Sequence, residues 1–270
     1  MNAPDISMIK AQTKAVWMAG DFGQIAKFTA PTAAAFIERR GVKRGMRVLD
    51  AACGNGNAAI PAAAAGAYVT GVDIAPNLLE AARERARRAR LNIRFDEGDV
   101  EALPYPDASF DLVVSMFGAI FAPRPERAAA ELIRVCRPGG QIAMANWTPG
   151  GFIGEQHEAL ARYLPARPGM ANPIDWGDPA KVRQRLGDGV TDLRMTPVMA
   201  SMKFPFSAAA TVEFFRTHFG PAQQAFAVLP DDKREGLRRD MEALYVRHNR
   251  ATDGTVHVEA EYLEVVATRA

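Results

Sequence analysis

The sequence predicts an α/β fold, a doubly wound, mostly parallel seven-stranded sheet that an antiparallel C-terminal strand completes. Three observations lead to this expectation. Short apolar runs rich in Val, Leu and Ile alternate with helical patterns between residues 42 and 147. The first run ends in Asp50 and enters a turn that contains Gly54 and Gly56. Two late stretches, 193–206 and 255–268, alternate apolar and polar residues and suggest a C-terminal hairpin that inserts into the sheet.

Five strands and the helices between them account for the first half of the chain. The expected strands are residues 47–51, 68–73, 92–97, 109–116 and 141–147. Helical patterns cover residues 58–65, 76–90 and 125–136, and Arg137-Pro138-Gly139-Gly140 predicts a tight turn into the fifth strand. This order predicts βαβ units in a Rossmann-like sheet with helices on both faces.

The remaining segments are expected to complete one domain over residues 1–270. Residues 1–41 are predicted to form a helical lid and residues 42–147 the cofactor-binding core. Residues 148–250, which contain a Pro- and Gly-rich part and then aromatic and charged helical patterns, are predicted to form cap elements around the strand near 193–206. No internal repeat or low-complexity linker divides the chain.

Composition excludes several classes of partner. With 33 basic and 31 acidic residues the formal net charge is +2, which gives no reason to expect a nucleic-acid partner. The two cysteines, Cys53 and Cys136, make neither a disulfide framework nor a metal site. No apolar run is long enough to cross a bilayer, so we expect a cytoplasmic protein that binds small molecules. The sequence does not indicate the oligomeric state.

The glycine turn first indicates a nucleotide. Gly54 and Gly56 fit the Gly-x-Gly-x-x-Gly/Ala pattern of dinucleotide sites, with Asp73 at the distance of a ribose-binding acid, so an NAD(P)-dependent oxidoreductase is one alternative. However, Asp50 precedes the glycines, where it would repel a pyrophosphate, and Asp99 follows the third strand. The turn contains no Lys or Arg to meet phosphate. An acid-rich pocket suits a ligand with a ribose, an amino group and a positive charge, as in S-adenosylmethionine.

Four segments carry a more specific resemblance. They are VLDAACGNGN (48–57), GVDIAPNLLEAAR (71–83), EGDVEALPYPDASFDLVVS (97–115) and ELIRVCRPGG (131–140). In this order they resemble the class I S-adenosylmethionine-dependent methyltransferases, of the ubiquinone/menaquinone-biosynthesis type. The first glycine of that family's acid-x-Gly-x-Gly-x-Gly pattern is Ala52 here.

The resemblance implies a role for each matching residue. S-adenosylmethionine would be the methyl donor, and a small, apolar or aromatic molecule would receive the methyl group by in-line displacement. A non-catalytic protein that binds the cofactor on the same fold is a further alternative. The implied positions are Asp50, Ala52, Gly54, Asn55 and Gly56 along the methionine part, Asp73 at the ribose hydroxyls, Ile74 on an adenine face, Asp99 and Val100 at the adenine edge, and Ser115, Met116 and Phe117 where the methyl group meets the acceptor.

Acceptor binding is expected to depend on segments outside the core. Trp17 and Phe22 either belong to a closing lid over residues 13–29 or pack an N-terminal helix on the sheet. Further aromatic residues, split between an apolar pocket and the core, are Phe117, Phe121, Trp147, Phe152, Trp176, Phe206, Phe214, Phe215 and Phe219. His157, His218 and His248 are candidate general bases for a weakly acidic acceptor, and His218, within the aromatic run, is the first choice.

Overall fold

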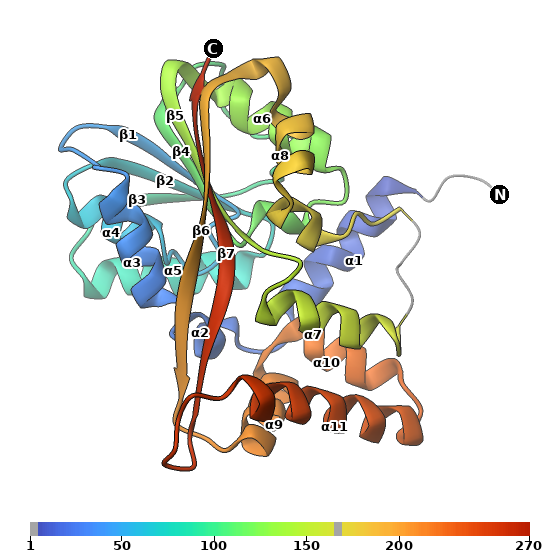
Figure 1. Cartoon of the computed structure of the whole chain (residues 1–270). Helices are drawn as coiled ribbons and strands as arrows, with labels where there is room; N and C mark the ends of the chain where they lie inside the picture. The colour runs from blue at the N-terminus through green and yellow to red at the C-terminus, as the bar shows by residue number, and fades with distance from the viewer. Residues whose placement is uncertain (1–4, 165–168) are drawn as a thin grey trace.

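The computed structural model describes residues 5–164 and 169–270 and contains the expected seven-stranded sheet (Figure 1). The strand order is β3-β2-β1-β4-β5-β7-β6, with parallel pairing from β3 to β5 and β7 antiparallel to both of its neighbours. The fold class predicted from the sequence is therefore confirmed. The two late strands pair antiparallel as expected, but three helices between them replace the turn of a hairpin. The strands are β1 (Arg47–Ala51), β2 (Tyr68–Asp73), β3 (Ile93–Glu97), β4 (Phe110–Met116), β5 (Cys136–Trp147), β6 (Val190–Phe204) and β7 (Val256–Arg269).

Helices cover both faces of the parallel part of the sheet. The chain runs from β1 outward to β3 and then returns to β4 and β5, so right-handed crossovers place the connecting helices of the two halves on opposite faces. On one face α4 (Ala59–Ala64) and α5 (Pro76–Arg88) pack on β2 and β3, with α3 (Ala30–Arg39) against α4. On the other, α6 (Pro125–Val135) packs on β4 and β5, with α8 (Pro179–Leu186) against α6.

A second group of helices lies beside the far half of the long β6–β7 ribbon (Figure 1). It contains α7 (Phe152–Ala161), α9 (Ala208–His218), α10 (Gly220–Val228) and α11 (Asp231–His248). The N-terminal helices α1 (Ile6–Met18) and α2 (Phe22–Ala26) contact this group through α10 and α9, and both also contact α5. Short 3-10 turns occur at η1 (Ala119–Phe121), η2 (Pro173–Gly177) and η3 (Gly187–Gly189).

The prediction of a tight turn before the fifth strand is wrong. Instead of a turn over 137–140, β5 begins at Cys136 and continues through it. The pairing with β4 moves from Phe110 opposite Cys136 to Leu112 opposite Gln141, so three extra residues are accommodated as an irregularity of the strand. Gly139, at φ 67°, supplies the backbone conformation that this requires. Other predicted boundaries differ by a few residues, such as β6, which begins at Val190.

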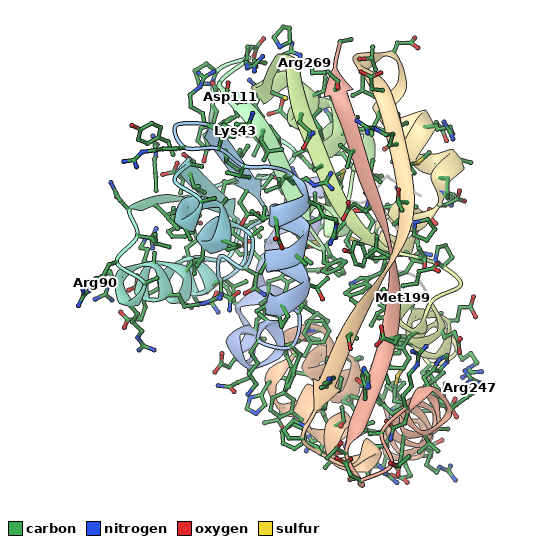
Figure 2. All side chains as sticks on the ribbon, turned by 60° about the vertical axis from the view of Figure 1, so that its left-hand side comes forward. Lys43, Arg90, Asp111, Met199, Arg247 and Arg269 are labelled. Atoms are coloured by element: carbon green, nitrogen blue, oxygen red, sulfur yellow. The ribbon has the colours of Figure 1, made fainter. Side chains whose placement is uncertain are left out.

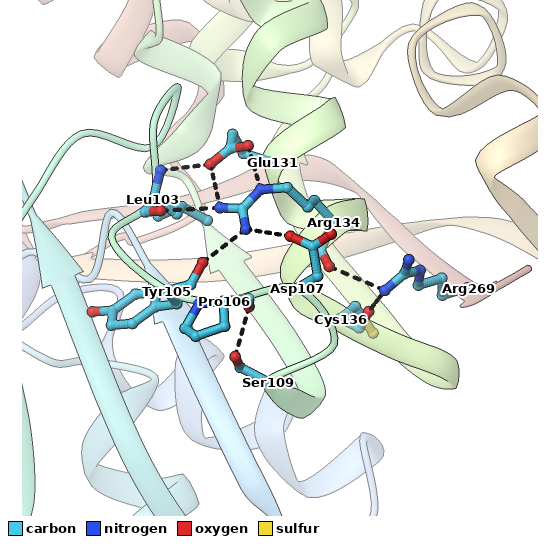
Figure 3. A network of polar contacts seen from close by, with 9 residues as sticks. All are labelled: Leu103, Tyr105, Pro106, Asp107, Ser109, Glu131, Arg134, Cys136 and Arg269. Carbon is cyan, nitrogen blue, oxygen red and sulfur yellow. Dashed lines mark hydrogen bonds and ion pairs between the residues drawn. The ribbon is translucent and has the colours of Figure 1, made fainter.

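Two of the motif segments meet through Arg134 of α6 (Figure 3). Its guanidinium donates to the carbonyl oxygens of Leu103 and Tyr105 and to the carboxylates of Asp107 and Glu131, at 2.7–3.0 Å. One side chain therefore fixes the loop between β3 and β4 against α6. This loop begins at Gly98 and Asp99, which reach the candidate site described below.

The predicted division into lid, core and cap remains a prediction. Residues 1–4 of the predicted lid and 165–168 of the predicted cap lie outside the described residues. Within residues 5–164 and 169–270, no helix is long and apolar enough to cross a membrane.

Candidate functional site

The loop after β1 has the compact shape that its sequence predicts. Ala52, Gly54 and Gly56 have φ angles of 55°, 53° and 83°, so the backbone bends through left-handed conformations at alternate residues. Asp50, at the end of β1, is 2% exposed, and its Oδ2 accepts a hydrogen bond from the Ala59 amide at 2.8 Å. Burial raises the pKa of this carboxyl to about 7. The loop therefore encloses an acid that a nearby cation would stabilise in its charged form.

Ala52 stands where the methyltransferases that the sequence resembles have glycine, and it adopts a left-handed backbone conformation that favours glycine. A left-handed φ costs an L-residue on the order of 1–2 kcal/mol. Directly opposite stands Gly118, and a Cβ on it would lie 2.3 Å from the Ala52 carbonyl oxygen. Phe117, next to this glycine, is also left-handed at φ 57°. The loops after β1 and β4 thus approach each other closely, and both hold strained residues at the contact.

Asp73 connects the end of β2 to the glycine loop. It is 8% exposed, and its two oxygens accept from the backbone amides of Gly54 and Ala75 at 2.8 and 2.9 Å. Burial raises its pKa, while these backbone hydrogen bonds oppose the rise. The carboxylate is thereby held in one orientation beside the loop.

Asp99, which follows β3, is already paired in this structure. Its Oδ1 accepts from the Glu101 amide at 2.9 Å, and its Oδ2 forms an ion pair with Lys10 of α1. Lys10 also contacts the Glu101 carboxylate at 2.7 Å. No local pattern in the sequence indicates this lysine, because 89 residues separate it from Asp99.

These groups line one cavity of about 130 Å³ at the carboxyl ends of the strands, which we call the cofactor cavity. Residues missed by sequence reasoning also line it, notably Lys10, Thr13, Cys53 and Asn57. The predicted residues that line it are Trp17, Phe22, Asp50, Ala52, Gly54, Asn55, Asp73, Ile74, Asp99, Val100, Met116 and Phe117.

Two residues that the resemblance places at the cofactor, Ser115 and Gly56, do not line this cavity. The hydroxyl of Ser115 donates to the Ala51 carbonyl at 2.8 Å and accepts from the Ala119 amide at 3.0 Å, so it ties β4 to β1. A Cβ on Gly56 would face Ala82 and a ring of β3, at 3.5 Å, which places its open side toward α5. Both residues shape the surrounding backbone.

A second cavity, of about 250 Å³, shares a wall with the first, and we call it the apolar cavity. Trp17, Phe22, Phe117 and Phe121 border both cavities, as does Thr29. Of the other predicted aromatic residues, Trp147, Phe215 and Phe219 line the apolar cavity, whereas Phe152, Trp176, Phe206 and Phe214 do not. Further walls are Ile25, Phe28, Ile153, Gln156, His157, Leu160, Met202, Phe204, Val212, Pro221, Ala222, Ala225, Phe226, Leu237, Met241 and Tyr245.

Aromatic contacts organise the shared wall. Phe117 stacks on Trp147 with ring centroids 3.7 Å apart and an interplanar angle of 4°. Trp17 meets Phe121 edge-on at 4.9 Å and Phe22 at 5.7 Å. Rings from α1, α2, β5 and the loop after β4 therefore lie where the two cavities adjoin.

The three candidate histidines lie in different places. His157 of α7 lines the apolar cavity. His218, the first choice from the sequence, lines neither cavity: its ring packs on Phe214 at 4.6 Å and its carbonyl accepts from the Asp21 amide. His248 lies 3.1 Å from the Glu155 carboxylate.

Comparison with known proteins identifies the family. A family model described as a methyltransferase domain matches residues 48–140, which contain the glycine loop, Asp73 and Asp99. The chain belongs to the class I S-adenosylmethionine-dependent methyltransferases. Within them it is similar to the ubiquinone/menaquinone-biosynthesis type, as its motifs predicted.

Relatives of this methyltransferase match it to different extents. An uncharacterized protein of Mycobacterium tuberculosis is 35% identical over 97% of this chain and 95% of its own. The demethylmenaquinone methyltransferase of Renibacterium salmoninarum is 38% identical over 48% of this chain and 54% of its own. Phosphoethanolamine N-methyltransferase 2 of Haemonchus contortus, solved with S-adenosylhomocysteine, shares the fold at a TM-score of 0.57 and 18% identity, over 88% of this chain and 52% of its own.

The cofactor of this methyltransferase is S-adenosylmethionine, and the cofactor cavity fits it chemically. Three carboxylates, Asp50, Asp73 and Asp99, line the cavity. The buried Asp50 has a raised pKa that a cation would lower, and the ligand carries both an ammonium and a sulfonium. The carboxylate oxygens can also accept from ribose hydroxyls and an amino group.

Proposed function

We propose that this methyltransferase moves the methyl group of S-adenosylmethionine to a small, apolar or aromatic molecule in the apolar cavity. The observation that carries the proposal is the shared wall: Phe117 and Phe121 border both the acid-lined cavity and the apolar one. A donor in the first and an acceptor in the second would meet there. No charged residue is among the described residues that line the apolar cavity, which favours an uncharged, apolar acceptor.

In this proposal the predicted cofactor residues keep the roles that the resemblance implies. Asp50 would face the ammonium group, Asp73 would accept from the ribose hydroxyls, and Asp99 from the adenine amino group. The backbone of Val100 and the side chain of Ile74 would contact the adenine. When the adenine binds, its amino group would replace Lys10 in part of the contact with Asp99, because the amino group and Lys10 donate to the same carboxylate.

The chain's contribution to the reaction would be orientation and exclusion of water. S-adenosylmethionine supplies a methyl group already activated by its sulfonium, so the transfer is an in-line displacement that depends on alignment. Met116 and Phe117 would confine the reacting atoms at the end of β4. Trp17 and Phe22, on α1 and α2, would close the entrance as a lid. Phe22 already lies 3.5 Å from where a Cβ of Gly54 would be.

Thermal unfolding with S-adenosylhomocysteine or NADPH tests cofactor choice. A ligand at a hundred times its Kd stabilises the folded state by roughly 2.7 kcal/mol, so a clear rise in Tm is expected with S-adenosylhomocysteine alone. Asp73→Asn should remove most of this rise. Asp111→Asn, at the opposite end of the sheet (Figure 2), should retain it. A rise with NADPH and none with S-adenosylhomocysteine would overturn the proposal in favour of an oxidoreductase.

Turnover needs its own experiment. The protein is incubated with a methyl-labelled donor and an extract of small metabolites, and label is followed into the fraction that partitions into organic solvent. Label in that fraction supports an apolar acceptor. Cofactor binding without any transfer would favour the non-catalytic alternative, and label in macromolecules would contradict the small-molecule acceptor.

A further inference from the structure

The apolar cavity contains few polar side chains. Among its described lining residues, those with a hydrogen-bonding group are Trp17, Thr29, Gln156, His157 and Tyr245. Three of these, Thr29, Gln156 and Tyr245, are engaged in hydrogen bonds within the protein. The Thr29 hydroxyl donates to the Ala26 carbonyl at 3.1 Å, and the Tyr245 hydroxyl is hydrogen-bonded to Gln156.

His157 is free of such contacts. Its imidazole makes no hydrogen bond or ion pair with any residue in the described ranges 5–164 and 169–270, although it lies on α7 facing the cavity. Trp17 can only donate through its indole N–H, and burial raises the pKa of the Tyr245 hydroxyl. Of the groups in the cavity wall, the imidazole is therefore the one that can take up a proton near neutral pH.

The charged side chains on and around α7, among them the exposed Glu158 next to His157, do not line the apolar cavity. Glu155 pairs with Arg247 and His248 of α11, and Arg162 pairs with Asp240 of the same helix. None of these five groups lines the apolar cavity. Burial alone lowers the pKa of His157, so its ring is neutral at pH 7 and retains one basic nitrogen.

We propose that His157 is the general base of this methyltransferase and that the acceptor is a phenol-type hydroxyl compound. The inference rests on the proposed function, since it needs donor and acceptor to meet at the Phe117 wall. The aromatic lining suits a ring, and a hydroxyl on that ring needs its proton removed, because direct methylation would leave a positively charged oxygen.

In the proposed reaction a methyl transfer is coupled to a proton transfer. The acceptor O–H bond breaks and its proton goes to the basic nitrogen of His157, while the oxygen electron pair forms the new O–CH3 bond. The S–CH3 bond breaks, and its electron pair stays on sulfur in S-adenosylhomocysteine. The products are an aryl methyl ether, S-adenosylhomocysteine and an imidazolium, which then loses its proton to water.

A chromogenic phenol tests the base without knowledge of the natural acceptor. 4-Nitrophenol absorbs differently as phenol and as phenolate, so its ionisation can be followed on the protein saturated with S-adenosylhomocysteine. In the wild-type protein we expect saturable binding with a substantial phenolate fraction. In His157→Gln the ratio of bound phenolate to phenol should fall about tenfold or more, because the partner cation cannot form.

A second measurement keeps the test independent of how well the variant folds. Calorimetry of wild-type binding in buffers of different ionisation enthalpy reports protons released to solvent. At a pH where free 4-nitrophenol is almost entirely the neutral phenol, transfer of its proton to His157 gives bound phenolate with almost no proton released to solvent. Phenolate formation with one proton released per site would overturn the assignment.

Kinetics provide the remaining comparison. For any phenol that the wild type methylates, His157→Gln should lose about 10²- to 10⁴-fold in kcat and also lose the rise of rate with pH through the histidine range. His218→Gln tests the residue chosen from the sequence, and a larger loss there would overturn our assignment. Absence of phenol binding, with an intact Tm rise from S-adenosylhomocysteine, would refute this inference and leave the proposed function standing.

Discussion

Replacing Asp50 by asparagine should stabilise the free protein at high pH and weaken its binding of S-adenosylhomocysteine. The carboxyl has a pKa of about 7 in the folded chain, against an ordinary value of 3.8. Between these two values the folded state holds a proton that the unfolded state has released. The free energy of unfolding therefore falls as pH rises through this window, and it stays low above pH 7.

The magnitude follows from the width of the window. Each pH unit corresponds to about 1.36 kcal/mol, so from pH 5 to pH 8 the wild type should lose about 2.7 kcal/mol over the two units below 7. Asparagine cannot ionise and lacks this loss. Its Oδ1 can still accept from the Ala59 amide, and any packing difference that does not depend on pH cancels when the two pH values are compared. The Tm of the asparagine variant minus that of the wild type should therefore be roughly 5–10 °C larger at pH 8 than at pH 5.

The assay is thermal or urea unfolding of both proteins at pH 5 and pH 8, with and without S-adenosylhomocysteine. With ligand, the asparagine variant should bind about tenfold to a hundredfold more weakly, since a hydrogen bond to a charged group contributes about 1.5–3 kcal/mol. A difference in stability between variant and wild type that is equal at the two pH values would refute the burial argument. Unchanged affinity would show that Asp50 does not contact the ligand.

Three further predictions concern the backbone and the charged contacts. Gly118→Ala should lower the free energy of unfolding by about 1–3 kcal/mol and weaken the binding of S-adenosylhomocysteine, because the new Cβ would lie 2.3 Å from a backbone carbonyl oxygen. Gly150→Ala, with open space around it, is the matched control in the same unfolding assay. Asp111, whose pKa two arginines lower to about 2, should stabilise the fold above pH 4 and lose this contribution as the pH falls toward 2. Acid titration followed by circular dichroism should therefore show Asp111→Asn and wild type converging at low pH, and a constant gap would contradict the sign. Arg134→Ala should cost about 2–4 kcal/mol in urea unfolding, whereas a similar loss for the exposed Arg90→Ala would show that the network in Figure 3 is not the cause.

The order of strands and helices was predictable because its signals are local. Each apolar run, glycine turn and helical pattern lies within a few residues of the element that it specifies. Asp50, Asp73 and Asp99 were predictable as a group for a related reason. Each lies at or just after the carboxyl end of a strand in one parallel sheet, and parallel strands end at the same edge.

Residues that reach the site from distant segments were not predictable. Lys10 contacts Asp99 only because α1 packs beside the core, and nothing near either residue in the sequence indicates it. Among the histidines, local sequence favoured His218, since aromatic residues surround it in the chain. Its helix directs the ring toward Phe214, away from both cavities. His157 lies in a polar stretch, and only the packing of α7 against α11 and β7 brings it to the apolar cavity.

The sequence by itself therefore determined the family, the sheet and the acids of the cofactor cavity, all of which depend on short spacings along the chain. Tertiary structure decided which aromatic residues line the apolar cavity and which histidine faces it. Those outcomes depend on how α7 and α11 pack on β7 and how α1, α9 and α10 pack against neighbouring helices, and such packing joins segments about 200 residues apart. Trp17 and Phe219, whose ring centroids lie 5.8 Å apart beside the apolar cavity, are one such pair.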